Sequence, residues 1–231
     1  MEHASGTRIS VIIPTLNEER AIVRTIASLQ PLSPDEIIVV DGGSTDRTRE
    51  LAAAHGVRLA VTSAGRARQM NRGAELARGE GLLFLHADTC LPASGLEDIR
   101  RALQDARIVA GRFDVALDGN RRSFRVIGAL ISWRSRLSRV ATGDQGMFVR
   151  KEIFERLGGF PEIPLMEDIA LSRMLKKTGK IACLRSRVVT SARRWEKEGV
   201  GRTIVKMWCL KLLYLCGFSP YGLKRYYGDA R

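Results

Sequence analysis

The chain has 231 residues, of which 45% are hydrophobic and 27% are charged, as is typical of a folded domain with a packed core. Its net charge of +13 and isoelectric point near 10.3 are unusual, and they favour anionic partners such as nucleic acid, nucleotide phosphates or an acidic membrane surface. The sequence contains no repeat or low-complexity linker, so we treat it as one domain.

Several sequence features exclude particular classes of protein. The four cysteines lie far apart without a C-x-x-C pair, which argues against a zinc site and against a disulfide framework. The N-terminus lacks the apolar segment of a secretory signal, and no apolar run reaches the roughly 18 residues that a membrane span needs. We therefore expect a cytoplasmic protein.

The beginning of the chain alternates between short buried strands and amphipathic helices. Apolar, β-branched runs predict strands at Ile9–Ile13, Glu36–Val40 and Val57–Val61, with intervening helices that end near Leu29 and His55. Strands separated by helices form parallel sheets with right-handed crossovers, so this pattern predicts an α/β fold.

Polar residues follow the first two strands, at the edge where open α/β sheets bind ligands. Pro14 ends the first strand, and we expect Asn17 to cap the next helix with Glu18 in its first turn. No G-x-G-x-x-G fingerprint follows, which disfavours a dinucleotide-dependent oxidoreductase. Asp41 ends the second strand before two glycines that permit close backbone approach, and it either binds a ribose or base or is an ordinary turn acid.

A loop with two arginines leads into the next predicted helix, which continues to about Ala77. Arg66 and Arg68 lie at or before the first turn, where cations oppose the helix dipole unless an anion lies between them and the backbone N–H groups. They therefore indicate a phosphate or carboxylate partner, or else they are solvated surface arginines.

The most informative stretch is Gly81–Pro92. Its apolar run Leu82–Leu85 predicts a strand buried on both faces, and the run ends in His86, Ala87 and Asp88. A carboxylate at the carboxyl end of a buried strand is a hard oxygen ligand suited to Mg²⁺ or Mn²⁺. The alternative is that Asp88 only caps the next turn or helix.

The second half of the chain is less regular. We predict a helix at Glu97–Leu103, a bulged strand at Ile108–Leu117 and a helix at Arg121–Val140. Six arginines accompany the last helix. They form either an anion-facing or membrane-facing surface or the solvated face of a core helix, and we favour the solvated face. A glycine-flanked loop then presents Asp144 and Gln145, whose side chains can hydrogen-bond hydroxyl groups.

Two adjacent acids, Glu167 and Asp168, begin another predicted helix. Adjacent helical positions point in different directions, so we expect only one of them to face a reaction centre. After a short strand at Ile181–Leu184, the apolar tail Ile204–Phe218 is too short to span a membrane. It either lies in a bilayer interface or packs on the domain or on a second subunit.

Three segments together resemble the family 2 glycosyltransferases of the GT-A fold: P-T-L-N-E after the first strand, V-V-D-G-G-S-T-D after the second and H-A-D after the fourth. The resemblance implies a mostly parallel, Rossmann-like sheet with flanking helices, a nucleotide-sugar donor, and Mg²⁺ or Mn²⁺ bound by Asp88. His86 stands where the family has another acid. The residues that the resemblance assigns to donor binding are Pro14, Asn17, Glu18, Asp41, Gly43, Arg66, Arg68, Asn71, His86, Ala87 and Arg194.

On the acceptor side, the resemblance makes Asp168 the catalytic base, with Glu167 second. The acceptor contacts that it implies are Asp144, Gln145 and Trp195. The family's Q-x-x-R-W element lacks its glutamine here, which favours a single transfer over chain extension. We expect one domain with a donor half at about 8–92, an acceptor half at about 93–198 and a C-terminal helical appendage, apolar in character, at about 199–231. The motifs also resemble a small bacterial subgroup associated with arsenosugar biosynthesis.

The sequence thus predicts a metal-dependent glycosyltransferase that moves one sugar from a nucleotide-diphosphate sugar to a hydroxyl acceptor, either a small molecule or a lipid. No second carboxylate is placed as a nucleophile, which favours inversion. A basic nucleic-acid-binding protein is the rival from another class, and the absence of its signatures disfavours it. A non-catalytic scaffold is disfavoured by the retained acids. Peripheral membrane contact and homo-oligomer formation are left open.

Overall fold

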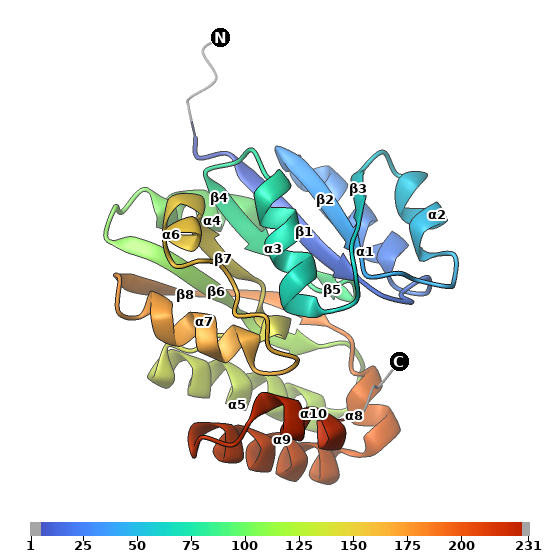
Figure 1. Ribbon diagram of the computed structural model, residues 1–231, viewed down its shortest axis with the longest axis vertical. Coiled ribbons are helices and arrows are strands. Elements are labelled where there is room, and N and C mark those ends of the chain that lie inside the picture. The colour runs from blue at the N-terminus through green and yellow to red at the C-terminus, as the bar shows by residue number, and fades with distance from the viewer. Residues whose placement is uncertain (1–5, 228–231) are drawn as a thin grey trace.

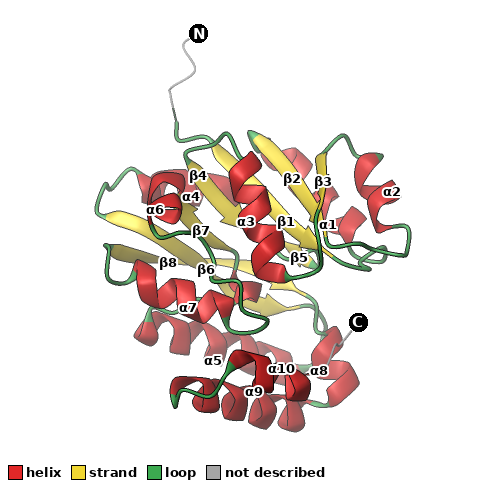
Figure 2. Cartoon of the chain, in the orientation of Figure 1, coloured by secondary structure: helices red, strands yellow, loops and turns green. Residues whose placement is uncertain are grey.

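The computed structural model describes residues 6–227 and shows a curled, mixed β-sheet with helices packed on its faces (Figure 1 and Figure 2). The strands are β1 (Ile9–Thr15), β2 (Glu36–Asp41), β3 (Arg58–Val61), β4 (Gly81–Phe84), β5 (Thr89–Cys90), β6 (Ile108–Leu117), β7 (Met147–Arg150) and β8 (Lys180–Thr190). The helices are α1 (Ile22–Leu29), α2 (Thr48–Ala53), α3 (Arg66–Leu76), α4 (Gly95–Leu103), α5 (Arg122–Ser138), α6 (Lys151–Arg156), α7 (Glu167–Leu175), α8 (Arg193–Glu198), α9 (Val200–Leu215) and α10 (Pro220–Tyr227).

The strand order of the sheet is β3-β2-β1-β4-β7-β6-β8-β5. The first four strands are parallel, which confirms the fold predicted for the beginning of the chain. Strand β7 runs antiparallel between β4 and β6, so the whole sheet is mixed. The predicted bulged strand is β6, whose pairing with β8 shifts register between Ile108 and Ala110 and between Phe113 and Asp114.

The central strands are buried on both faces, as their continuous apolar runs predict. Ile9, Val11 and Ile13 of β1 point into a core that α1 and α4 cover, whereas Ile12 points into a second core beneath α3. The alternation follows from the two-residue period of a strand. Packing in both cores fixes the positions of β1 and β4. The carboxyl ends of these two strands carry the polar loops of the site.

Helix α3 packs closely on the sheet because Gly73 has no side chain. A Cβ at this position would lie 2.3 Å from Cγ2 of Ile12. We expect Gly73→Ala to destabilise the protein by about 1–3 kcal/mol, since the added methyl overpacks a rigid core. Chemical unfolding with urea measures the change. Gly201→Ala is the matched control, because nothing lies within 4 Å of a Cβ added there. Equal stability of the two variants would contradict the packing argument.

Several elements differ from the sequence-based predictions. Asn17 does not cap α1, which begins at Ile22 after Ala21 without a side-chain cap. Strand β8 is longer than predicted, and α8 was not predicted. The apolar tail forms α9, which begins at Val200. Within residues 6–227, no helix has both the length and the apolar character needed to cross a bilayer.

Candidate active site

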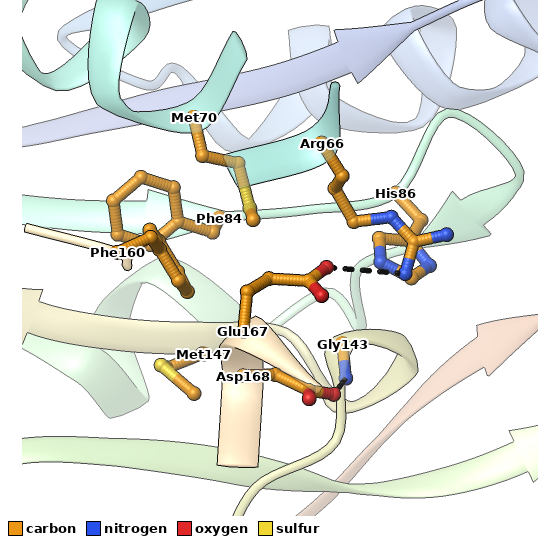
Figure 3. Close-up of a pocket in the computed structure, with 9 residues that line it drawn as sticks. All are labelled: Arg66, Met70, Phe84, His86, Gly143, Met147, Phe160, Glu167 and Asp168. Atoms are coloured by element: carbon orange, nitrogen blue, oxygen red, sulfur yellow. Dashed lines mark hydrogen bonds and ion pairs between the residues drawn. The ribbon is translucent and has the colours of Figure 1, made fainter. Parts of the chain in front are cut away.

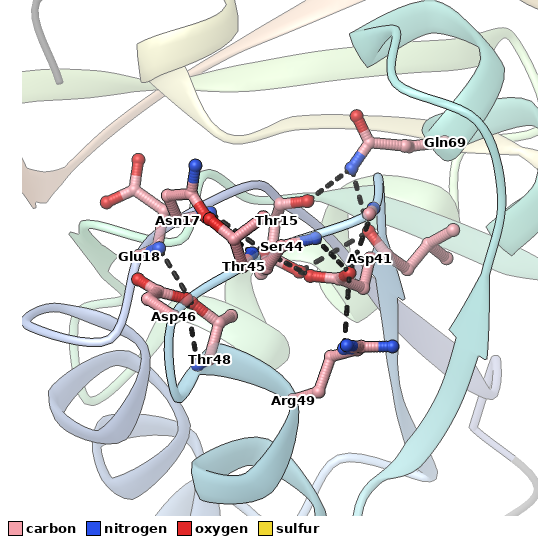
Figure 4. A network of polar contacts seen from close by, with 12 residues as sticks. Thr15, Asn17, Glu18, Asp41, Ser44, Thr45, Asp46, Thr48, Arg49 and Gln69 are labelled. Atoms are coloured by element: carbon pink, nitrogen blue, oxygen red, sulfur yellow. Dashed lines mark hydrogen bonds and ion pairs between the residues drawn. The ribbon is translucent and has the colours of Figure 1, made fainter.

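Asp41 ends β2 and holds the turn that follows it (Figure 4). Its carboxylate accepts hydrogen bonds from the backbone N–H groups of Gly43 at 3.0 Å and Ser44 at 2.8 Å, from the Ser44 hydroxyl at 2.5 Å and from the Thr15 hydroxyl at 3.2 Å. The side chain is fully buried, with Nε of Arg49 at 3.9 Å. Asp41 therefore shapes the loop surface from beneath and does not project into solvent.

The loops after β1 and β2 are joined by a row of hydrogen bonds. The side-chain oxygen of Asn17 accepts from the backbone N–H of Thr45 at 2.9 Å, and the hydroxyl of Ser44 accepts from the N–H of Asn17 at 2.8 Å. The hydroxyl of Thr48 accepts from the N–H of Glu18 at 2.8 Å. Asn17 adopts a left-handed φ of 54°, which asparagine tolerates. Its side chain thus bridges two loops instead of capping a helix.

Gln69 of α3 ties the same two strands from the other side, and sequence reasoning did not single it out. Its Nε2 donates to the backbone carbonyls of Thr15 at 2.6 Å and Val40 at 2.9 Å. It also lies against Gly42, where an added Cβ would come within 3.1 Å of its amide. Pro14 is half-buried opposite Val40 in the parallel pair. Contacts within the protein therefore fix the sheet edge that carries both loops without the help of a ligand.

Asp88 follows β4 and is a partly exposed carboxylate, with 24% of its side chain accessible. Nη2 of Arg193 lies 3.4 Å from Asp88 and 3.0 Å from Glu18. Burial raises the pKa of Asp88, and the guanidinium of Arg193 opposes that rise. Arg193 therefore links the loop after β1 to the loop after β4, because the carboxylates of Glu18 and Asp88 share its guanidinium group.

A small pocket lies between α3, the end of β4 and the start of α7 (Figure 3). It is lined by Arg66, Met70, Phe84, His86, Gly143, Met147, Phe160, Glu167 and Asp168. Phenylalanine and methionine side chains form one end of the pocket, and the charged groups form the other. His86 packs on Gly143, where an added Cβ would come within 2.6 Å of the His86 Nε2. A side chain at position 143 would therefore push the His86 ring out of its place against the loop.

The two adjacent acids of α7 both reach this pocket, with different partners. Oε1 of Glu167 lies 3.5 Å from Nη1 of Arg66, and Oδ2 of Asp168 accepts from the N–H of Gly143 at 2.7 Å. Burial raises the pKa of Asp168 to about 7, and the neighbouring Glu167 carboxylate adds to the rise. Met166, just before them, has a left-handed φ of 69°, a strained conformation of the kind found at functional sites.

Three of the residues assigned to donor binding have contacts within the protein. Asn71 exchanges two hydrogen bonds of 2.9 Å with the backbone of Phe160, and so fixes the loop that brings Phe160 to the pocket. Arg68 pairs with Glu162 at 3.1 Å on the surface. Ala87 is 4% exposed and belongs to the core beneath α1 and α4. Arg66 therefore lines the pocket, whereas Arg68 pairs with Glu162 outside it.

Three further residues singled out in the sequence also have contacts within the protein. Gln145 is fully buried, and its side chain closes a turn by accepting from the N–H and hydroxyl of Thr142, both at 3.1 Å. Arg194 stacks 4.2 Å from the ring centroid of Tyr227, and Trp195 packs on the apolar side of α5. Successive residues of α8 point in different directions, so Arg193 faces Asp88 and the two residues after it do not.

Sequence reasoning also missed two cations on the acceptor side. Arg134 of α5 has buried Nε and Nη2 atoms with no hydrogen-bond partner among residues 6–227. Burial lowers the pKa of Arg134, and the carboxylates of Asp144 and Asp168 oppose this. Burial, together with Arg134, also lowers the pKa of Lys211 on α9, which Asp168 again opposes. Nothing in the sequence distinguished Arg134 from the other arginines of its helix.

The surroundings of Asp88 suit a cation such as Mg²⁺, which needs few ligands from the protein. In the part of the chain that the structure describes, no three His, Cys, Asp or Glu side chains converge as a protein-only metal site. Mg²⁺ commonly uses one or two carboxylates and completes its shell with water and substrate phosphates. A single accessible carboxylate, with the charge of Asp144 close enough to raise its pKa, matches that mode of binding.

The fold is similar to those of several solved glycosyltransferases. A mannosyltransferase from Pyrobaculum calidifontis, solved with GDP-Man and Mn²⁺, gives a TM-score of 0.69 at 19% identity, covering 99% of this chain and 67% of that one. Glucosyl-3-phosphoglycerate synthase from Mycobacterium tuberculosis, solved with Mn²⁺, UDP and glucosyl-3-phosphoglycerate, gives 0.66 at 23% identity, covering 93% and 81%. At these identities the likeness establishes the shared fold.

Curated relatives match shorter segments. A PGL/p-HBAD biosynthesis glycosyltransferase from Mycobacterium bovis is 42% identical over 91 residues, which are 36% of this chain and 36% of its own length. Glycosyltransferase AglD from Haloferax volcanii is 29% identical over 171 residues, which are 68% of this chain and 26% of AglD. These matches span a minor part of each relative, and the arsenosugar subgroup stays a prediction.

The family assignment rests on a longer match. Residues 10–158 match the family described as glycosyl transferase family 2. This region is more than half of the chain and contains the loops after β1 and β2, Asp88 and the loop of Gly143, whereas Asp168 lies beyond it. The chain belongs to glycosyl transferase family 2.

Proposed function

We propose that this protein transfers a sugar from a nucleotide-diphosphate sugar to a hydroxyl group of an acceptor, in a single step with inversion at the anomeric carbon. One observation carries the proposal. The partly exposed carboxylate of Asp88 and the buried carboxylate of Asp168, whose pKa burial raises to about 7, both lie close enough to Arg66 for its charge to lower their pKa values. Asp88 would hold a cation that neutralises the leaving diphosphate. Asp168 would accept the proton of the attacking hydroxyl group.

The donor half supplies a rigid platform for the nucleoside diphosphate. The joined loops of Asn17 and Ser44 offer backbone groups at the carboxyl edge of parallel strands, the usual ligand position in such sheets. Arg193 and Arg66 would offset the charge of the diphosphate. When bound at Asp88, Mg²⁺ or Mn²⁺ would supply further neutralisation of the leaving diphosphate.

The acceptor half supplies the base. In the proposed step, the acceptor oxygen attacks the anomeric carbon while the bond from that carbon to the diphosphate oxygen breaks. The hydroxyl proton passes to Asp168, and the leaving diphosphate keeps the electron pair. Glu167 is 3% exposed and paired with Arg66, so it is not free to form a covalent intermediate. A single displacement inverts the anomeric configuration.

Donor binding tests the proposal directly. We expect a nucleotide-diphosphate sugar to raise the melting temperature in the presence of Mn²⁺, because a ligand at about 100 times its Kd stabilises by about 2.7 kcal/mol. A panel of UDP and GDP sugars is compared with AMP and with inorganic pyrophosphate, each with and without EDTA. If no nucleotide sugar stabilises the protein more than these controls, the proposal is wrong.

Stereochemistry is checked separately. With water as a slow acceptor, proton NMR at early times reports the configuration of the released sugar. We expect inversion relative to the donor. Release of a sugar with retained configuration would be compatible with donor binding. It would exclude a single displacement assisted by Asp168.

A further inference from the structure

Helix α5 exposes an apolar stripe on the side opposite the sheet. Val126, Leu130, Trp133 and Leu137 follow the spacing of one helix face, and each is between 56% and 68% exposed. The opposite side of the helix, which includes Phe124 and Gly128, packs on β6. Such a row is unusual, because folded proteins seldom leave large contiguous apolar patches in water.

Helix α9 carries a second stripe of the same kind. Val205, Trp208 and Leu212 are 62% to 64% exposed, and Leu215 continues the row at 49%. The buried side of α9 instead presents Thr203 and Leu210 to the protein. The last helix, α10, adds two tyrosines that are 65% and 74% exposed, Tyr221 and Tyr226.

The two stripes lie on neighbouring helices. Val200, at the start of α9, packs in one cluster with Ile127 and Ile131 of α5, whereas Leu210 and Tyr214 pack near Val140 beyond the end of α5. Helix α9 therefore runs beside α5 along most of its length, and both helices, with α10, form the side of the molecule farthest from α2 and β3 (Figure 1). We call the exposed side of α5, α9 and α10 the C-terminal face.

The charge of the C-terminal face has one sign. The sequences of α5, α9 and α10 contain no aspartate or glutamate, while α5 carries four arginines, α9 one arginine and two lysines, and α10 one of each. Some of these cations are held by contacts inside the protein, such as Lys206 with Glu198 at 2.9 Å. The exposed basic residues of the three helices include Arg122, Arg125, Arg202, Lys224 and Arg225.

We propose that the C-terminal face docks on the surface of an anionic lipid bilayer, with α5 and α9 lying in the plane of the interface. Apolar side chains flanked by Lys and Arg, with tryptophan at the boundary, are the features that hold amphipathic helices at such a surface. Each basic residue near an anionic leaflet adds attraction.

A second copy of this chain is a poorer occupant for the same face. Symmetric pairing of the patch on itself would bring its arginines and lysines against their own copies, with no acid on these helices to offset them. The positive charge of the C-terminal face therefore favours an anionic partner over a second copy of the chain. The orientation also matters for the site, because Arg134 of α5 and Lys211 of α9 lie close enough to Asp168 for its carboxylate to raise the pKa of both. Docking would place the acceptor side of the pocket beside the lipid headgroups.

Vesicle co-sedimentation tests this proposal without reference to catalysis. We expect the full chain to sediment with phosphatidylcholine vesicles that contain about 30% phosphatidylglycerol, and to stay in the supernatant with phosphatidylcholine alone. Raising NaCl to about 0.5 M weakens the binding, because the charged part of the attraction is screened. No sedimentation with the anionic vesicles would overturn the proposal.

Two paired variants locate the binding face. Trp133→Gln with Trp208→Gln, and Arg122→Glu with Arg125→Glu, should each lower vesicle binding by about tenfold or more, since apolar insertion and charge both contribute. The matched controls are Val61→Gln, at another exposed apolar position, and Arg78→Glu with Arg101→Glu, at exposed cations on other elements. Equal losses in the controls would show that vesicle binding does not depend on this face in particular and would overturn the assignment.

Self-association is measured on the same samples. Sedimentation velocity of the wild type without vesicles should show a monomer. A dimer that dissociates in the Trp133→Gln, Trp208→Gln variant would show that a second copy covers the face, and it would overturn the membrane proposal. Unchanged far-ultraviolet circular dichroism confirms that the variants fold, as expected for exposed positions.

Discussion

Asp88→Asn is expected to weaken the binding of a nucleotide-diphosphate sugar by about a hundredfold and to abolish its dependence on Mn²⁺. Asp88 is the accessible carboxylate at the end of β4, and asparagine keeps its shape while removing its charge. Calorimetric titration of the donor, with Mn²⁺ and with EDTA, measures both effects. The fold should persist, because Arg193 keeps its second partner, Glu18, at 3.0 Å.

The matched control for this variant is Asp118→Asn. Asp118 also pairs with an arginine, Arg24, at 2.5 Å, and 45% of its side chain is exposed. It lies outside the pocket, and its loss should leave donor binding unchanged, as expected for a surface ion pair. Tight, metal-dependent binding by Asp88→Asn would mean that the cation is held elsewhere, and it would remove the central contact of the proposed donor site.

Much of the donor half was predictable because its signals are local. Asp41 and Asp88 both follow apolar runs, so the sequence alone places them at or just after the carboxyl ends of buried parallel strands. The same reasoning cannot show what a side chain faces. Asp41 is fully enclosed by the turn that follows it, and Gln145 is buried within its own loop.

The remaining site residues depend on contacts between segments that are far apart in the chain. Gln69 reaches the ends of β1 and β2 only because α3 packs across both strands, and no local pattern marks it. The choice between Arg193 and Arg194 depends on where α8 starts, and one residue changes the direction of a helical side chain by about 100°. Arg134 is distinguished from its neighbours only by burial in the folded protein.

Asp168→Asn is expected to lower kcat by about 10²–10⁴-fold while leaving the Kd of the donor unchanged, because it removes a general base and no donor contact. The structural reason is that Asp168 combines a hydrogen bond from the loop of Gly143 with a pKa raised to about 7 by burial. Glu155→Gln, on an exposed part of α6, is the control that removes a carboxylate outside the pocket.

The pH profile distinguishes a base from a residue that only shapes the pocket. The base must be deprotonated, so kcat/KM of the wild type should rise with pH below about 7 and level off above it. This rise should disappear in Asp168→Asn. In Glu167→Gln the midpoint should move to lower pH, because a neighbouring negative charge that raises the pKa of Asp168 is gone. An unchanged midpoint in Glu167→Gln, together with a normal rise in Asp168→Asn, would assign the proton transfer to another group.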